Sequence, residues 1–210
     1  MATRPDNMAR GVATVVGVGL SALLKFSGVL APGWFSEIVT WTPTIVVMVF
    51  MIWDIWIWKL PPVLLLHSRP RIDGLWEGSV LPSAETGRVT TGPIRSFVVI
   101  NQTFWSLHVY LCTEESTSMS RVANLCANKA AGLSELVYVY DSEPQASVLD
   151  RSPVHCGAAR LRCPGREPKQ LEGGYFTQRL TRGDMILRFV DRSSDALTYT
   201  ECVRRVDKKG

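Results

Sequence analysis

The chain has 210 residues, of which 46% are hydrophobic and 20% are charged, and its formal net charge is +4. This length allows one ordinary domain and a membrane segment, but hardly two soluble domains. The charges are unevenly distributed, because residues 11–66 carry only four charged side chains whereas residues 71–210 carry 18 basic and 16 acidic ones. The second part is therefore almost neutral, which argues against binding to DNA or RNA polymers, since those ligands need a strongly basic face.

Two long apolar stretches occupy the N-terminal third of the sequence, at residues 11–31 and 38–60. Each is long enough to cross the roughly 30 Å hydrocarbon core of a bilayer as a helix. A short link that contains Pro32-Gly33 joins them, so we predict a transmembrane hairpin of two helices within residues 1–68. A cleavable signal peptide that ends near Ala31 is the alternative interpretation of the first stretch.

Basic residues flank this predicted hairpin on one side only. Arg4 and Arg10 precede the first stretch, Lys59 and Arg69 close the second, and the link between the stretches has none. Since basic residues collect on the cytoplasmic side of a membrane, we predict a multi-pass protein with both termini in the cytoplasm.

Two charged residues, Lys25 and Asp54, fall inside the predicted spans. At 1.5 Å of rise per residue their depths differ by roughly 10 Å, which is too far for a direct ion pair within one hairpin. We expect Lys25 to reach toward its nearer interface, whereas Asp54 either does the same or meets a partner or water in an assembly of several chains. Ala13, Gly17 and Ser21 recur every four residues and form a stripe suited to close helix packing.

From residue 69 onward the pattern changes to short alternating or β-branched runs separated by turn signals. About eight strands at hairpin spacing predict an all-β domain over residues 69–210, a small up-and-down β-barrel. The Arg182-Gly183-Asp184 segment predicts a tight turn between two strands, and residues 120–131 are a weak helix candidate. The predicted strands cover 75–81, 94–101, 106–113, 136–141, 158–163, 175–180, 185–190 and 197–206, with a less certain one at 117–125.

The sequence has none of the local motifs that mark common catalytic or metal sites. Its five cysteines are odd in number and lack metal-binding spacing, so we expect reduced thiols and no metal or cofactor. We therefore predict a protein that is not an enzyme.

Six side chains suited to binding fall on three of the predicted strands: Tyr138, Tyr140, His155, Tyr175, Thr177 and Arg179. Aromatic rings stack nucleobases, and an arginine pairs with phosphate through two hydrogen bonds. Such a set would suit a small anionic ligand that carries bases. A filled barrel that serves as a membrane-anchored scaffold, and a lipocalin-like barrel for an apolar ligand, are the alternatives that the residues leave open.

Four segments, taken in order, make the sequence resemble a known family. The first, Ile72 to Gly78, is similar to the G-x-W start of lipocalin-like barrels, and the others are Val137 to Pro144, His155-Cys156-Gly157 and Leu171 to Gly183. Together with the apolar stretches, they resemble the effectors of the CBASS anti-phage systems that have two transmembrane helices and a β-rich domain. The resemblance covers nearly the whole chain. A second glycine at position 174 leaves the strand register near Tyr175 open.

The resemblance implies a function. In this family a nucleotide cyclase of the CD-NTase type senses infection and makes a cyclic oligonucleotide, for which we predict a cyclic dinucleotide. The β-barrel binds this messenger, and the cyclase acts on the effector only through it. The effector then assembles with further copies of itself among the lipids of the bacterial inner membrane, disrupts that membrane and causes abortive infection.

Overall fold

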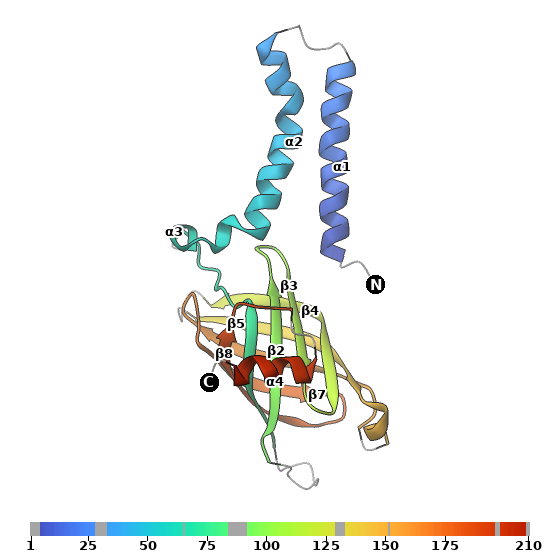
Figure 1. Cartoon of the computed structure of the whole chain (residues 1–210), viewed down its shortest axis with the longest axis vertical. Coiled ribbons are helices and arrows are strands. Elements are labelled where there is room, and N and C mark those ends of the chain that lie inside the picture. Colours follow the sequence, from blue (N-terminus) through green and yellow to red (C-terminus); the bar gives the residue numbers. More distant parts are fainter. Residues whose placement is uncertain are drawn as a thin grey trace. The chain divides into compact units, whose positions relative to one another are not determined.

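The computed structural model describes residues 5–27, 33–64, 66–83, 92–128, 133–150, 152–195 and 198–208. The chain divides into two compact units, Met1–Val63 and Leu64–Gly210 (Figure 1). The first unit is helical and the second is a β-barrel with a short helix after it.

Two antiparallel helices, α1 (Pro5–Phe26) and α2 (Trp34–Ile55), form the first unit, followed by the short turns η1 (Ile57–Lys59) and α3 (Pro61–Leu64). Gly17 lies so close to α2 that an added Cβ would be 3.0 Å from Val47 Cγ2. The Ser21 and Thr44 hydroxyls lie 2.8 Å apart, and Thr44 Oγ1 donates to the Gly17 carbonyl at 3.3 Å. Two members of the small-residue stripe therefore pack within the hairpin, whereas the third, Ala13, is exposed.

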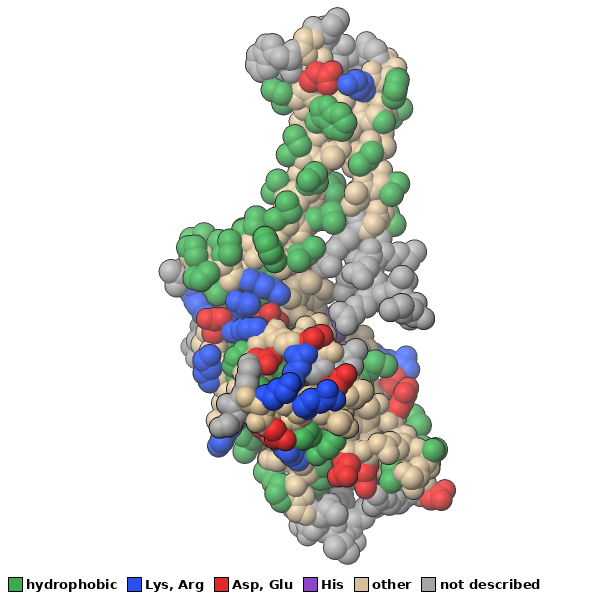
Figure 2. Space-filling model, viewed as in Figure 1, with side chains coloured by type: hydrophobic (Ala, Val, Ile, Leu, Met, Phe, Trp, Pro, Cys, Tyr) green, Lys and Arg blue, Asp and Glu red, His purple; other side chains and the backbone are tan. Residues whose placement is uncertain are grey.

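The apolar surface of these helices is extensive, as the green side chains along them show (Figure 2). One described segment, Ser36–Lys59, is long and apolar enough to cross a membrane, and Gly11–Phe26 is a shorter apolar helix. Residues 28–31, which complete the predicted first span, lie outside the described residues. The structure thus supports one candidate span, and the two-span topology stays a prediction.

Lys25 forms an ion pair that the sequence analysis did not assign. Its Nζ lies 3.4 Å from Glu37 Oε2 and 5.9 Å from the centre of the Trp41 ring. Both partners lie near the start of α2, at the turn between the helices, so Lys25 is balanced there rather than by Asp54.

Eight described strands close into a barrel in which each strand pairs antiparallel with the next along the chain and β8 pairs with β1. The predicted all-β, up-and-down barrel is confirmed. The strands are β1 (Gly74–Pro82), β2 (Ile94–Gln102), β3 (Leu107–Cys112), β4 (Ser116–Asn128), β5 (Leu133–Pro144), β6 (His155–Pro164), β7 (Gln170–Thr177) and β8 (Arg182–Asp191), with the 3-10 turn η3 (Ala146–Val148) between β5 and β6.

The strand predicted at residues 197–206 is wrong, because this segment forms helix α4 (Tyr199–Asp207). The Thr198 side chain accepts from the Glu201 backbone amide, and the Glu201 carboxylate accepts from the Thr198 amide. This reciprocal capping box favours a helix start. The weak helix candidate at 120–131 is also wrong, since its described part belongs to β4.

Helix α4 packs on the outer face of the barrel over β1, β2 and β3. Phe97 and Tyr199 meet edge to face with ring centres 5.4 Å apart, and the buried Cys112 and Cys202 sulfurs lie 3.8 Å apart. This layer gives the outward side chains of three strands a second core, so the barrel is apolar on both faces there.

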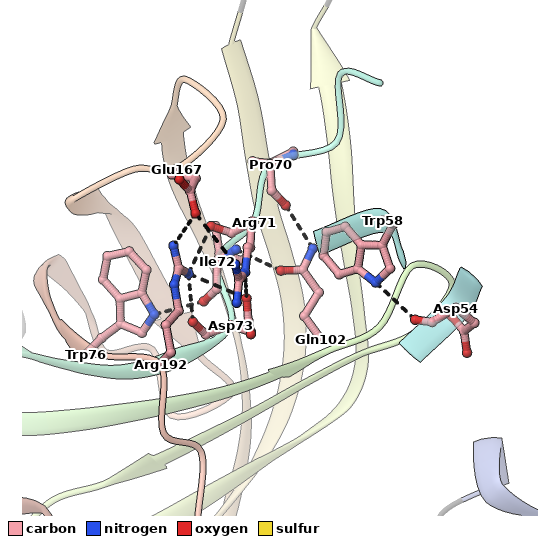
Figure 3. A network of polar contacts seen from close by, with 10 residues as sticks. All are labelled: Asp54, Trp58, Pro70, Arg71, Ile72, Asp73, Trp76, Gln102, Glu167 and Arg192. Carbon is pink, nitrogen blue, oxygen red and sulfur yellow. Dashed lines mark hydrogen bonds and ion pairs between the residues drawn. The ribbon is translucent and has the colours of Figure 1, made fainter. Parts of the chain in front are cut away.

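The barrel interior is filled at the end where β1 begins, which we call the plugged end. Trp76 is fully buried there, and its Nε1 donates to the Ile72 carbonyl at 2.9 Å (Figure 3). Gln102 accepts from the Ile72 amide and donates to the Pro70 carbonyl, each at 2.8 Å. These bonds satisfy buried backbone groups of residues 70–73, so the segment that leads into β1 is held across this end.

An ionic cluster at the plugged end holds the same segment from outside. Arg71 Nε lies 2.9 Å from Asp73 Oδ1, and Arg192 donates to the Asp73 carbonyl at 3.0 Å and to Glu167 at 2.7 Å (Figure 3). The apolar filling behind it includes Ile100, Leu107, Leu136, Leu161, Leu171 and Leu187.

Candidate ligand-binding mouth of the barrel

The opposite end of the barrel, which we call the mouth, is where β5 and β7 end and β6 and β8 begin. Tyr140 pairs with Gly157, which pairs with Thr177, and Tyr138 pairs with Ala159, which pairs with Tyr175. Residues paired directly across antiparallel strands point to the same face, and here that face is the interior. The structure therefore brings five of the six predicted binding residues to adjacent strands, with His155 at the start of β6.

The tyrosines occupy different depths. Tyr138 is 2% exposed and its hydroxyl lies 3.9 Å from Met185 Sδ, so it belongs to the core. Tyr140 is 9% exposed, and its ring centre lies 5.8 Å from that of Tyr138. Burial, with a smaller effect from the neighbouring Tyr175, raises the pKa of Tyr140 to about 12. Tyr140 and the half-buried Tyr175 are thus neutral phenols at the level of the mouth.

Two glycines make room for these rings. A Cβ on Gly157 would lie 2.5 Å from both Cζ and the hydroxyl of Tyr140, and one on Gly183 would lie 2.8 Å from Tyr175 Cε1. Real Cβ atoms do not approach so closely, so each ring lies where only a glycine leaves space. The positions of Tyr140 and Tyr175 therefore depend on β6 and β8 as well as on their own strands.

Arg179 does not continue β7, contrary to the prediction that it shares a strand face with Tyr175 and Thr177. The strand ends at Thr177, and a turn follows in which the Thr177 amide donates to the Thr181 carbonyl at 2.9 Å. The exposed Leu180 takes the positive φ of 59° in this turn. Arg179 instead reaches sideways, and its Nη1 donates to Ser152 Oγ at 2.8 Å, in the loop between β5 and β6.

The predicted tight turn at residues 182–184 is likewise displaced. Those residues begin β8, so Gly183 lies inside the strand. Only glycine fits there, because a Cβ would lie 2.1 Å from the Leu81 carbonyl oxygen. The glycine marks a close approach of β1 and β8 rather than the turn itself.

His155 lies beside Arg179 at the rim of the mouth. Its Nδ1 lies 2.9 Å from the Pro153 carbonyl oxygen, which makes Nδ1 the donor in that contact. Burial lowers the pKa of His155, the bond to Pro153 opposes this, and the positive charge of Arg179 lowers the pKa further. The lowered pKa favours a neutral imidazole next to the Arg179 guanidinium.

The register near Tyr175, which the second glycine at position 174 left open, is set by regular pairing of Gly173, Gly174 and Tyr175 with successive residues of β6. Tyr175 packs against the interior core cluster, so it faces inward. Thr177 also faces inward and is 8% exposed, and its hydroxyl lies 2.6 Å from that of Thr181.

A layer of serines inside the barrel was not anticipated from the sequence. Ser96, Ser118 and Ser142 are all buried, with exposures of 0%, 7% and 4%. Ser118 pairs with the inward Leu111 on one side and with Ser142 on the other, and Ser96 alternates with the inward Val98 and Ile100. The sequence places these serines at alternating positions in or next to predicted strands. That pattern alone does not distinguish a serine buried inside the barrel from one exposed on its outer face.

The chemistry available at the mouth is that of hydrogen bonding and stacking. Among the described residues, its donors and acceptors include neutral hydroxyls and phenols, the His155 imidazole and the Arg179 guanidinium. Across the described residues, no group of three His, Cys, Asp or Glu side chains is placed to hold a metal ion.

Comparison with known proteins bears on what the barrel binds. Residues 67–188 match the protein family described as "Cap15, cyclic dinucleotide receptor domain". The chain belongs to this family. The protein named CD-NTase-associated protein 15 from Staphylococcus schleiferi is 27% identical over 156 residues, which cover 74% of this chain and 80% of that relative. These matches support a CBASS effector that binds cyclic nucleotides. The Cap15 match includes all six predicted binding residues, whereas α1, α2 and α4 lie outside it.

The Gly157–Tyr140 contact predicts a selective effect of adding one methyl group. Gly157→Ala should displace the Tyr140 ring and reduce the free energy of unfolding by about 1–3 kcal/mol. The melting temperature of the full chain in detergent should fall by several degrees. Gly174→Ala is the matched control, because its Cβ would only touch the Gly183 carbonyl oxygen at 3.5 Å. Equal melting temperatures for the two variants would contradict this account.

Proposed function

We propose that this protein is a non-catalytic membrane effector whose barrel mouth binds a cyclic dinucleotide. The observation that carries this proposal is the cluster of Tyr140, Tyr175, His155 and Arg179 at one end of a barrel whose other end is filled. Two neutral rings beside a guanidinium match the two parts of such a ligand, because bases stack on aromatic faces and phosphates pair with arginine.

In the proposed complex, Tyr140 or Tyr175 stacks against a base, while Arg179 meets a phosphate at the rim. Thr177 lies between these groups on β7 and offers a hydroxyl. Tyr138 supports Tyr140 from below rather than touching the ligand, since it is fully enclosed by the core. His155 assists Arg179, and it becomes charged when a phosphate approaches.

A polar mouth separates this proposal from its two alternatives. A lipocalin-like site for an apolar ligand would have a mainly apolar wall, whereas the inward residues here include Ser118, Ser142 and Thr177. A scaffold with a filled barrel would need no buried hydroxyls at one level, because such groups cost stability unless they are hydrogen-bonded.

Residues 1–68 would anchor the effector in the bacterial inner membrane as a two-helix hairpin, with residues 69–210 and both termini in the cytoplasm. The apolar segment Ser36–Lys59 and the exposed apolar side chains of α1 support this part of the proposal. Ligand binding would shift the protein toward an oligomer, provided that the oligomer binds the ligand more tightly. The clustered hairpins would then disrupt the bilayer.

The proposed assembly gives separate tasks to the membrane residues. Gly17 and Ser21 hold α1 against α2 within each chain, and the exposed Ala13 continues the stripe on α1 toward other copies. Asp54 lies near the end of α2, where its carbonyl accepts from Trp58 Nε1 at 3.0 Å (Figure 3). Asp54 is already only 6% exposed in the single chain. Because an ionisable residue inside a span is costly in lipid, we assign it a role in the assembled state.

Arg179→Ala should weaken binding of the preferred cyclic dinucleotide by about 10- to 100-fold, because the variant loses a charge-assisted hydrogen bond whose free energy corresponds to a change of that size. The barrel should stay folded, because Arg179 lies in a turn outside the strands. Calorimetric titration of the full chain in detergent measures the affinity. Arg162→Ala, on the exposed outer face of β6, is the control. Wild-type affinity for the Arg179 variant would refute the site assignment, although the receptor function would stand.

The affinity should rise as the pH falls from about 8 to about 6, by at most about tenfold per pH unit. The reason is that the pKa of His155 is lowered in the free protein and would be raised by a bound phosphate, so binding takes up a proton. The dependence should disappear below the free-state pKa, where both states are protonated. His155→Gln should bind with little pH dependence, and a variant that retained the wild-type profile would exclude His155 as the titrating group.

Asp54→Asn should bind the cyclic dinucleotide as the wild type does, yet should release less dye from liposomes when the ligand is added. The change keeps the side-chain shape and removes the charge that we assign to the assembly. Glu37→Gln, at the turn between the helices, provides the control. Normal dye release and oligomer formation by the Asp54 variant would remove this residue from the mechanism.

A further inference from the structure

Ser96 presents an unusual buried hydroxyl inside the barrel. The residue is 0% exposed, and its Oγ has no hydrogen-bond partner among the described residues. Its position on β2 alternates with Val98 and Ile100, both members of the interior core cluster. Successive inward positions of a strand share a face, so the Ser96 side chain points into the barrel.

A hydroxyl without a partner destabilises the free protein relative to an alanine of the same shape, because it has lost its hydrogen bonds to water. Most buried polar groups in folded proteins do have partners, so an exception calls for an explanation. A polar group of a bound ligand would supply the missing partner.

The level of Ser96 in the barrel tells which ligand group could reach it. Counted from the mouth, Ser96 on β2, Ser118 on β4, Ser142 on β5 and Gly157 on β6 each lie two residues inward from the end of their strand. Ser118 and Ser142 pair directly with each other. We call these four inward positions near the mouth the hydroxyl layer. The Tyr140 ring lies over Gly157 in it.

The hydroxyl layer separates two different environments. Toward the plugged end lie the apolar side chains around Trp76 and Leu187, and toward the rim lie Arg179 and His155. The residues of the layer carry no charge. A phosphate buried at this depth would leave its negative charge without a counter-ion, which is far more costly than burying a neutral polar group.

We propose that Ser96 hydrogen-bonds to the edge of a nucleobase that enters the barrel first, while the phosphates stay at the rim. This inference rests on the proposed function and adds to it the orientation of the ligand and a residue that determines base preference. A hydroxyl both donates and accepts, so it matches amide, amine and carbonyl groups of a base edge. Stacking on Tyr140 would hold the plane of the base, and Ser96 would read its edge.

Ser96→Ala, measured in the full chain in detergent, tests the inference. Calorimetric titration with cyclic dinucleotides of adenine, guanine, uracil and cytosine should show about tenfold weaker binding of the preferred ligand and a smaller difference between bases. The melting temperature of the ligand-free variant should equal or exceed that of the wild type, since the variant lacks the unpartnered hydroxyl. Ser134→Ala is the matched control, because Ser134 is buried on β5 near the plugged end.

The outcomes separate the inference from the function on which it rests. If the wild type binds no member of the panel, the proposed function fails. If the wild type binds and Ser96→Ala binds equally well, only the inference fails. If Ser96→Ala loses the same affinity for every base, Ser96 contacts the sugar instead. If the ligand-free variant has a clearly lower melting temperature than the wild type, the Ser96 hydroxyl is structural. Either result overturns the base contact.

Discussion

The limited width of an eight-stranded barrel governs both the stability and the site of this domain. Such a barrel has room either for packed side chains or for one small ligand. The size of the inward residues therefore decides whether a given part of the barrel is packed core or can hold a ligand. Near the plugged end the inward residues are large, and Trp76 is locked by its bond to Ile72 while Gln102 satisfies the crossing backbone. Near the mouth the described inward residues include serines, glycines and two tyrosines that lie over glycines, beside the apolar Val80, Leu111 and Met185. One constraint therefore yields a core at one end and a polar site at the other.

The site is built by pairs of residues rather than by single ones. Tyr140 depends on Gly157 of the next strand, Tyr175 depends on Gly183, and Arg179 is oriented by Ser152 across the mouth. Ring positions are thus set by the strand register, which hydrogen bonds along the whole barrel maintain. A ligand that met these groups would encounter surfaces already in place, which reduces the entropy lost on binding.

The order of environments along the barrel axis suits the proposed ligand. A charged rim, a neutral hydroxyl layer and an apolar filling follow one another from the mouth inward. A cyclic dinucleotide has the same order if it enters by a base, with phosphate outside and base inside. Ligand binding can act on the membrane residues only if the oligomer binds the ligand more tightly than the single chain does. A ligand shifts the equilibrium between single chain and oligomer only by that difference in affinity.

The sequence by itself determined the class of the protein: apolar helices at the N-terminus, an up-and-down barrel, and tyrosines at positions 138 and 140 on one face of a strand. These features follow from local periodicity, which is two for strands and does not depend on distant residues. Only the tertiary structure decided that residues 199–207 form a helix, that Arg179 lies in a turn, and that Ser96, Ser118 and Ser142 are buried inside the barrel near its mouth. A short apolar segment fits helix or strand until its cap and its packing surface choose between them. The level of a residue in a barrel depends on the register of all the strands between it and its neighbours, which no local pattern encodes.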